Sequence, residues 1–203
     1  MKMRDNIPVP KTESASEENQ RLFEILETQH GFVPNLMAVM ALSDTAPRMY
    51  LDQINRTTSL TTREIEIINL VVSEYHQSLY CSSYHQEVIS DEILTADEIL
   101  AVRNFKSTNE KEQSLIDIVL RIVGNKGNVP DRYFKQFLNT GHSLEQLVDI
   151  IMVIANKTIS NYLYKVFAFP IDFPWATPLT AKSSFKRYKD LATSYYREKR
   201  NIN

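Results

Sequence analysis

Glycine and cysteine are scarce in this 203-residue chain, which contains 4 glycines and 1 cysteine. A shortage of glycine disfavours a sheet protein with many tight turns and favours helices joined by short links. A single cysteine excludes an intrachain disulfide, so disulfide bonds do not hold this fold together.

Long apolar runs and an excess of one charge are also missing. The most apolar stretch, residues 147–155, is interrupted by Asp149 and is too short to span a membrane. The N-terminal residues contain no apolar segment of the secretory type. Because 23 basic residues stand against 25 acidic ones, composition gives no reason to expect nucleic acid or a membrane as a partner. We therefore expect a cytoplasmic protein.

Helix start and stop signals recur along the chain. Capping-box pairs, in which Ser or Thr is followed three residues later by Glu or Gln, occur at Thr61, Thr95 and Ser143. Asp44 is a further candidate cap. Together with apolar residues spaced three and four apart, these signals predict ten helices. Eight have both bounds: 35–42, 46–55, 61–75, 78–89, 110–123, 143–164, 183–199, and one that runs from Pro130 to Gly141. Of the other two, one ends at Gly31 and one begins at Thr95. No segment has the pattern of a strand, so the predicted fold class is all-α.

The chain divides into three parts by composition. Residues 1–15 are polar and contain prolines, which predicts an extended arm. Residues 16–175 carry the helical pattern and form one predicted domain. Residues 176–203 comprise the end of a proline-rich linker and a basic amphipathic helix, whose aromatic side suits contact with a neighbouring subunit.

Cys81 and His85 are the residues that indicate chemistry. They lie four residues apart, so on one helix their side chains share a face. An imidazole beside a thiol can take its proton, and the thiolate is the form that attacks peroxides and disulfides. Ser78 as N-cap places Cys81 at the third helical position, where the helix dipole also favours the thiolate.

Two other readings of these residues stay open. A lone cysteine is often a small buried apolar residue with no reactivity. His76, Cys81 and His85, with Glu74, are also of the types that bind zinc, although their spacing matches no common closed zinc site. We expect neither a metal nor a cofactor.

The segment 60–85, LTTREIEIINLVVSEYHQSLYCSSYH, resembles the signature of the carboxymuconolactone decarboxylase / alkylhydroperoxidase D-like family. That signature has a Glu twelve residues before the first Cys of Cys-x-x-Cys and a His four residues after the second. Glu66, Cys81 and His85 match it, and Ser78 stands in place of the first Cys. Residues 31–51 and 148–171 are similar to the peroxidase-related branch, so the resemblance covers most of residues 20–175.

The resemblance implies an alkylhydroperoxidase D-like helical bundle that assembles into a trimer or hexamer. It implies a peroxidase or antioxidant activity in which Cys81 is the nucleophile, His85 its base and Glu66 a buried proton relay. Ser78 can hydrogen-bond the thiolate but cannot close a disulfide with it. The expected activity is therefore a one-cysteine reduction of hydroperoxides, with an external thiol as the reductant.

Two alternative functions remain. His85 and Glu66 could perform acid–base chemistry on a small lactone or carboxylic acid, as in the decarboxylase branch, although no arginine cluster lies near the motif to hold a carboxylate. The chain could also be a non-enzymatic or catalytically degenerate member of the family that acts as an oligomeric scaffold.

Overall fold

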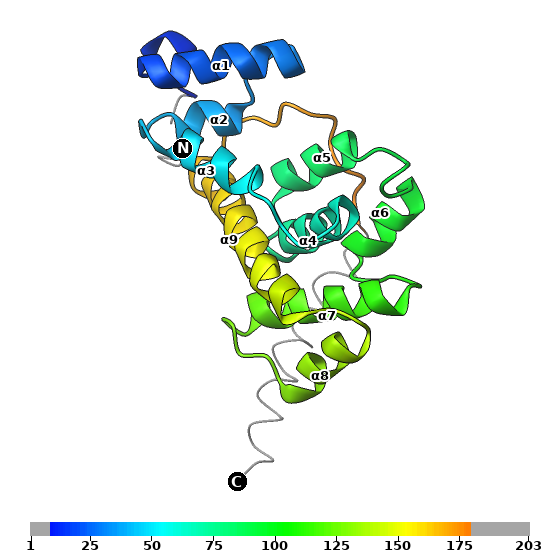
Figure 1. The fold of residues 1–203 in the computed structure, drawn as a ribbon. Coiled ribbons are helices and arrows are strands. Elements are labelled where there is room, and N and C mark those ends of the chain that lie inside the picture. Colours follow the sequence, from blue (N-terminus) through cyan, green and yellow to red (C-terminus); the bar gives the residue numbers. More distant parts are fainter. Residues whose placement is uncertain (1–8, 180–203) are drawn as a thin grey trace.

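The computed structural model describes residues 9–179, and in this range it contains helices and no strand (Figure 1). The all-α fold class is confirmed. After a short 3-10 helix at Thr12–Ser14, the helices are α1 Glu17–His30, α2 Asn35–Met40, α3 Ala46–Ile54, α4 Thr62–Tyr75, α5 Leu79–Val88, α6 Ala96–Arg103, α7 Glu110–Gly124, α8 Asp131–Asn139 and α9 Leu144–Phe167. None of them is long and apolar enough to cross a membrane.

Helix α4 lies at the centre of the main apolar core. It packs against α5, α6, α7 and α9, and its residues Ile67, Ile68 and Val71 have no exposed surface. They join Leu115 of α7 and Ile150 of α9 in one cluster. Burial of such aliphatic side chains contributes about 1.5–3 kcal/mol each, so this cluster is the main source of stability in the fold.

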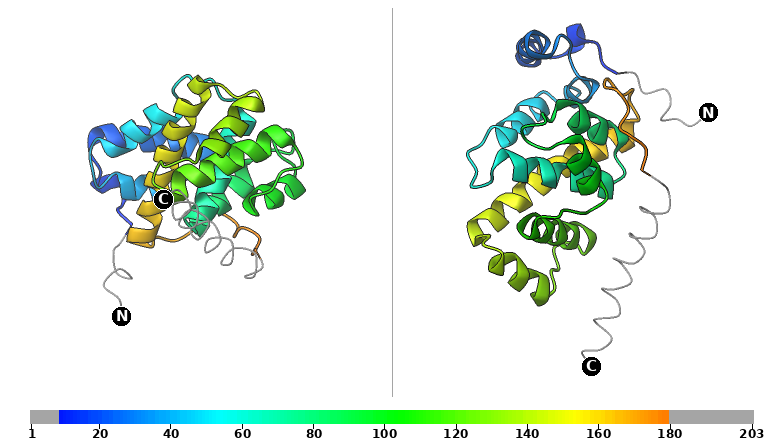
Figure 2. Two further views of the ribbon diagram at one scale, coloured as in Figure 1. Left: turned by 90° about the horizontal axis from the view of Figure 1, so that it is seen from below. Right: turned by 90° about the vertical axis from the view of Figure 1, so that its right-hand side faces the viewer.

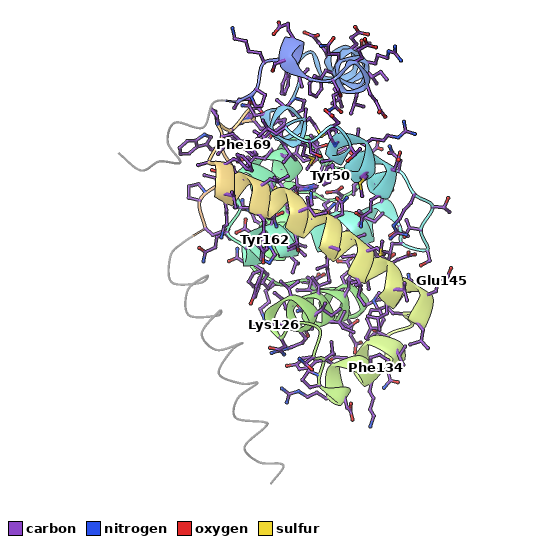
Figure 3. The ribbon with its side chains drawn as sticks, turned by 90° about the vertical axis from the view of Figure 1, so that its left-hand side faces the viewer. Tyr50, Lys126, Phe134, Glu145, Tyr162 and Phe169 are labelled. Atoms are coloured by element: carbon purple, nitrogen blue, oxygen red, sulfur yellow. The ribbon has the colours of Figure 1, made fainter. Side chains whose placement is uncertain are left out.

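Helices α1, α2 and α3 form a second cluster at the other end of the molecule from α7 and α8 (Figure 2). Phe23 and Leu26 of α1 pack there against Met37, Met40 and Tyr50. Helix α9 connects the two ends, running past the central helices in Figure 3, and it contacts α2, α3, α4, α5 and α7. Its length lets one helix take part in both clusters.

Residues 169–177, which we call the strap, follow α9 without regular structure and run back to α5 (Figure 1). Phe169 is buried with Val39, Tyr80 and Cys81 in a third cluster. At its other end the backbone N–H of Ala176 donates to Ser83 Oγ (2.9 Å), and that of Thr177 donates to Gln86 Oε1 (3.1 Å). The strap therefore fixes the outer side of α5.

The three predicted capping boxes are all present, at the starts of α4, α6 and α9. Gly31 ends α1 in the left-handed conformation (φ 79°), as its position predicts. Helix α9 extends to Phe167, beyond the predicted end. Most helix boundaries are therefore correct to within a few residues.

Two predicted helix starts are wrong in detail. Asp44 does not cap α3, whose N-cap is Thr45 with no side-chain hydrogen bond. Pro47 lies in the first turn of α3 and has no N–H, which removes one of the amides that a cap accepts from. Pro130 is the N-cap of α8, one position before the first helical residue. The predicted helix 183–199 and most of the predicted arm 1–15 lie outside the described residues.

Candidate active site

The turn between α4 and α5 brings the family-like residues together. His76 caps α4, and Gln77 adopts a left-handed conformation (φ 53°), which reverses the chain before α5 begins. Glu66 on α4 and His85 on α5 thereby meet, with Glu66 Oε2 2.6 Å from His85 Nδ1. Glu66, expected as a proton relay near Ser78 and Cys81, therefore has its contact with His85.

Lys157 of α9 completes a chain of three polar groups. Its Nζ lies 2.6 Å from His85 Nε2, and both side chains are buried, with Lys157 6% and His85 3% exposed. An ammonium group can only donate, so His85 Nε2 accepts. The proton of the imidazole then resides on Nδ1, from which it is donated to Glu66.

Burial and mutual charge set the protonation states of the three groups. Burial and the charge of Lys157 lower the pKa of His85, against the influence of Glu66, so the imidazole is neutral near pH 7. Burial by itself raises the pKa of Glu66, but His85 and Lys157 outweigh it and hold that pKa below its usual value. Burial by itself lowers the pKa of Lys157, but negative charge on the acidic groups around it, Glu66 among them, outweighs burial and raises it. The resting cluster is therefore carboxylate, imidazole and ammonium.

Cys81 lies one turn before His85 on α5 and is 2% exposed. Its thiol donates to Ser160 Oγ of α9 (3.6 Å), and the Ser160 hydroxyl donates to the backbone carbonyl of Lys157 (2.9 Å). Within residues 9–179 the hydrogen bonds of His85 go to Glu66 and Lys157, and none joins it to Cys81. The two residues share a helix face as predicted, but the hydrogen-bond partner of each is on another helix.

Ser78 is the N-cap of α5, as predicted, but its hydroxyl does not cap the helix. The group is fully buried and finds no hydrogen-bond partner in the described part of the chain. The hydroxyl that bonds the Cys81 sulfur belongs to Ser160 instead.

A cavity of about 480 Å³ opens onto these residues. Its polar wall contains Glu66, Asn69, Cys81, His85, Asn156 and Lys157. The rest is mainly apolar and comes from α1, α2, α3, α9 and the strap, including Leu26, Leu36, Met37, Leu51, Met152 and Phe173. This size and lining are typical of a site for a small organic molecule.

The strap holds the neighbours of Cys81 in place. Tyr80 donates its hydroxyl hydrogen to Asp172 (2.7 Å), and the same hydroxyl accepts from the backbone N–H of Leu36 (3.4 Å). Burial and the Asp172 carboxylate raise the pKa of Tyr80, so the phenol stays protonated. Phe173 packs edge-on against Tyr84. These contacts close one side of the cavity over α5.

A zinc site of the considered kind is not assembled. The described residues contain no group of three or more His, Cys, Asp and Glu side chains that could hold a metal ion. Glu74 pairs with Arg103 (2.6 Å), and His76 lies against the rings of Tyr75 and Tyr162. Burial and Lys165 lower the pKa of His76 to about 4.

Lys157 and Ser160 are the site residues that sequence reasoning missed. Lys157 shares a helix face with Ile150, Ile154 and Asn161, at spacings of seven, three and four. A lysine on the apolar face of a long helix is unusual, because a charged group is buried only when it is paired. The position of Lys157 within this apolar face was the feature of the sequence that could have identified it.

No family model and no curated protein sequence matches the chain. Solved structures do. An alkylhydroperoxidase AhpD core, an uncharacterized peroxidase-related protein from Ralstonia eutropha JMP134, has a TM-score of 0.70 at 22% identity over 81% of this chain and 90% of that one. An uncharacterized peroxidase-related protein from Silicibacter sp. TM1040 has a TM-score of 0.69 at 16% identity, over 89% and 93%.

A third similar structure is the debrominase Bmp8, with a TM-score of 0.69 at 17% identity over 93% of this chain and 99% of that one. A cysteine-to-alanine variant of Bmp8, also similar to this chain, was crystallised in complex with 2,3,4-tribromopyrrole. Together these likenesses show that the chain has the alkylhydroperoxidase D-like fold, as the resemblance implied.

Proposed function

We propose that the protein is a thiol-dependent peroxidase-like enzyme in which Cys81 alone carries the redox chemistry. One observation carries the proposal: the only thiol of the chain opens onto an apolar cavity whose wall also holds the Glu66–His85–Lys157 cluster. An inert core cysteine needs neither a cavity nor a buried proton-transfer cluster beside it. Two of the similar structures are named as peroxidase-related, which agrees with this reading.

The first half-reaction converts the thiol to a sulfenic acid. The thiol proton leaves toward the buried cluster, and the thiolate attacks the outer oxygen of the hydroperoxide. An S–O bond forms, the O–O bond breaks, and its electron pair leaves on the alkoxide. The alkoxide takes up the proton that the thiol gave, so that Cys–SH and ROOH become Cys–SOH and ROH.

The second half-reaction needs external thiols, because Ser78 stands where a resolving cysteine would be. One external thiol attacks the sulfenic sulfur, forming a mixed disulfide and releasing water. A second external thiol then frees Cys81 and leaves as the disulfide of the reductant.

Hydroperoxide consumption with a small-molecule thiol as reductant tests the proposal. The wild-type protein should turn over, Cys81→Ser should not, and both should unfold alike. Ser78→Cys adds the second cysteine that the site lacks. After oxidation, this cysteine should form a disulfide with Cys81 within one chain, which mass spectrometry detects. Absence of turnover together with an unmodified Cys81 would favour the degenerate scaffold.

A second candidate is acid–base chemistry without redox change. Sequence reasoning counted against it because no arginine cluster lies near the motif to hold a carboxylate, but Lys157 supplies a cation beside the His85–Glu66 pair. A carboxylate substrate could be held by this ammonium group. The two candidates separate on one variant, because acid–base activity on a lactone or carboxylic acid survives Cys81→Ser and peroxidase activity does not.

We also propose that the protein assembles with copies of itself, as the resemblance implies for a trimer or hexamer. Support comes from the outer side of α9, which exposes Val148, Ile151, Ile159, Tyr162 and Val166. Light scattering on the wild type and on Ile159→Glu tests this. A monomeric wild type would contradict it.

A further inference from the structure

Lys157 is a buried cation that the family-like motif does not account for. An ammonium group has three N–H donors. Within the described residues, His85 Nε2 is its only hydrogen-bond acceptor, and no carboxylate oxygen lies within 4.0 Å of its Nζ. Burial of a charged group is costly unless it is compensated, so the position calls for an explanation.

Its place in the fold supplies one. Cys81 and His85 lie four residues apart on α5, and they face Lys157 and Ser160, three residues apart on α9. Cys81 is hydrogen-bonded to Ser160, and His85 is hydrogen-bonded to Lys157. These two hydrogen bonds connect α5 to α9. The Lys157 ammonium is thereby held on the same cavity wall as the sulfur.

We propose that Lys157 is a positioning residue whose positive charge, held on the same cavity wall as the sulfur, favours the thiolate form of Cys81. The inference rests on the site of the proposed function, but it concerns the ionisation of Cys81 and holds for any reaction of that thiolate. Both side chains line the same cavity wall, and a positive charge near a thiol favours its ionised form.

Lys157 keeps its proton throughout and acts through its charge. In the peroxide reaction the proton that Cys81 loses is returned to the leaving alkoxide, so Lys157 and His85 end with the charges they began with.

Several other titratable groups surround the cluster and must be kept constant in any test. Besides Glu66 of α4 and His85 of α5, they are Tyr50 of α3, Tyr80 and Tyr84 of α5, Tyr164 of α9 and Asp172 of the strap. Burial raises the pKa of Tyr84 and Tyr164, so neither is the anion that balances Lys157 near pH 7.

The test is the rate at which iodoacetamide alkylates Cys81 in the full chain, measured against pH. Lys157→Met removes the charge and keeps the length of the side chain. Near neutral pH its alkylation should be slower than that of the wild type by about 10-fold or more, the change that corresponds to one pH unit. At high pH, where both thiols are ionised, the two rates should converge. Loosened packing would instead speed alkylation at every pH.

A second readout separates charge from shape. Iodoacetate is an anion of nearly the same size as iodoacetamide. The positive charge of Lys157 attracts it, which raises the rate of alkylation by iodoacetate relative to the rate by iodoacetamide. That ratio should fall in Lys157→Met and in the second variant Lys157→Gln, which serves if the first folds poorly. Lys165→Met is the matched control, since Lys165 is exposed on the same helix, and it should leave both readouts unchanged.

The inference and the proposed function can fail separately. An unchanged pH profile and an unchanged reagent ratio in both Lys157 variants would overturn the inference, even if peroxide oxidises Cys81. A changed profile in a protein whose Cys81 resists peroxide would uphold the inference and count against the peroxidase.

Discussion

Each half of α9 has a buried face, but the residues buried in the two halves are of different kinds. In the first half, Ile150 and Ile154 join the apolar cluster of α4 and α7. In the second half, the fully or nearly buried residues are polar: Asn156, Lys157, Ser160 and Asn161. Each of these four has a hydrogen bond to a neighbouring group.

The first half of α9 therefore contributes mainly to stability, and the second half mainly to the candidate active site. Apolar burial stabilises the fold, whereas buried polar groups contribute little net stability even when they are satisfied. Proteins keep such groups where function needs them. Variants on the two sides should therefore have opposite signatures, one in unfolding and the other in reactivity.

Leu115→Ala should give the largest change in stability. Leu115 of α7 is fully buried in the cluster of Ile150 and Ile154, and a leucine truncated in a core costs about 2–5 kcal/mol. Denaturant unfolding measures the loss, with Ile25→Ala, an exposed position, as the control. Cys81 alkylation under native conditions should not change, and a large change there would break the separation.

Glu66→Gln should instead change the reactivity of Cys81 much more than the stability of the fold. The variant retains the shape of the side chain but removes the proton acceptor at the end of the cluster. Oxidation of Cys81 by hydroperoxide should slow by about 100-fold, the lower range for loss of general acid–base help. Stopped-flow kinetics measures it, with exposed Glu24→Gln as the comparison. An unaltered rate would remove Glu66 from the mechanism.

Acidification should destabilise the polar half. The pKa values of His85 and His76 lie below their usual value in the folded state, and that of His76 is about 4. Between pH ~6.5 and pH 4, the unfolded chain therefore binds more protons than the folded one, and the free energy of unfolding falls as pH falls. Urea unfolding against pH should show this slope, and His76→Gln should reduce it. A slope that is the same in the variant would exclude His76 as a cause.

Ser78→Ala should have the smallest effect. The Ser78 hydroxyl is buried without a hydrogen-bond partner among the described residues, so its removal should change the free energy of unfolding by less than ~1 kcal/mol. Alkylation of Cys81 should also stay the same. Slower alkylation would instead restore Ser78 to its predicted role at the thiolate.

Local signals explain what could be predicted from the sequence. A capping box depends on residues three apart, so the starts of α4, α6 and α9 were predicted from their own segments. The cap of α3 was predicted wrongly because Pro47, inside the helix, alters the set of free amides. Cys81 and His85 were identified from their spacing of four residues, and Glu66 from a resemblance that depends on spacing within the same stretch.

The rest of the site depends on contacts between distant segments. Lys157 is 72 residues from His85 and Ser160 is 79 from Cys81. Only the packing of α9 against α5 determines that these residues meet. The cavity likewise arises where α1, α2, α3, α9 and the strap converge, and no single segment contains its pattern.

Mass spectrometry of Cys81 after one equivalent of an organic hydroperoxide tests the central claim most directly. The account predicts a sulfenic acid at Cys81, trapped by dimedone in the native protein, and a mixed disulfide when an external thiol is added. A Cys81 that stays unmodified while the protein remains folded would contradict it.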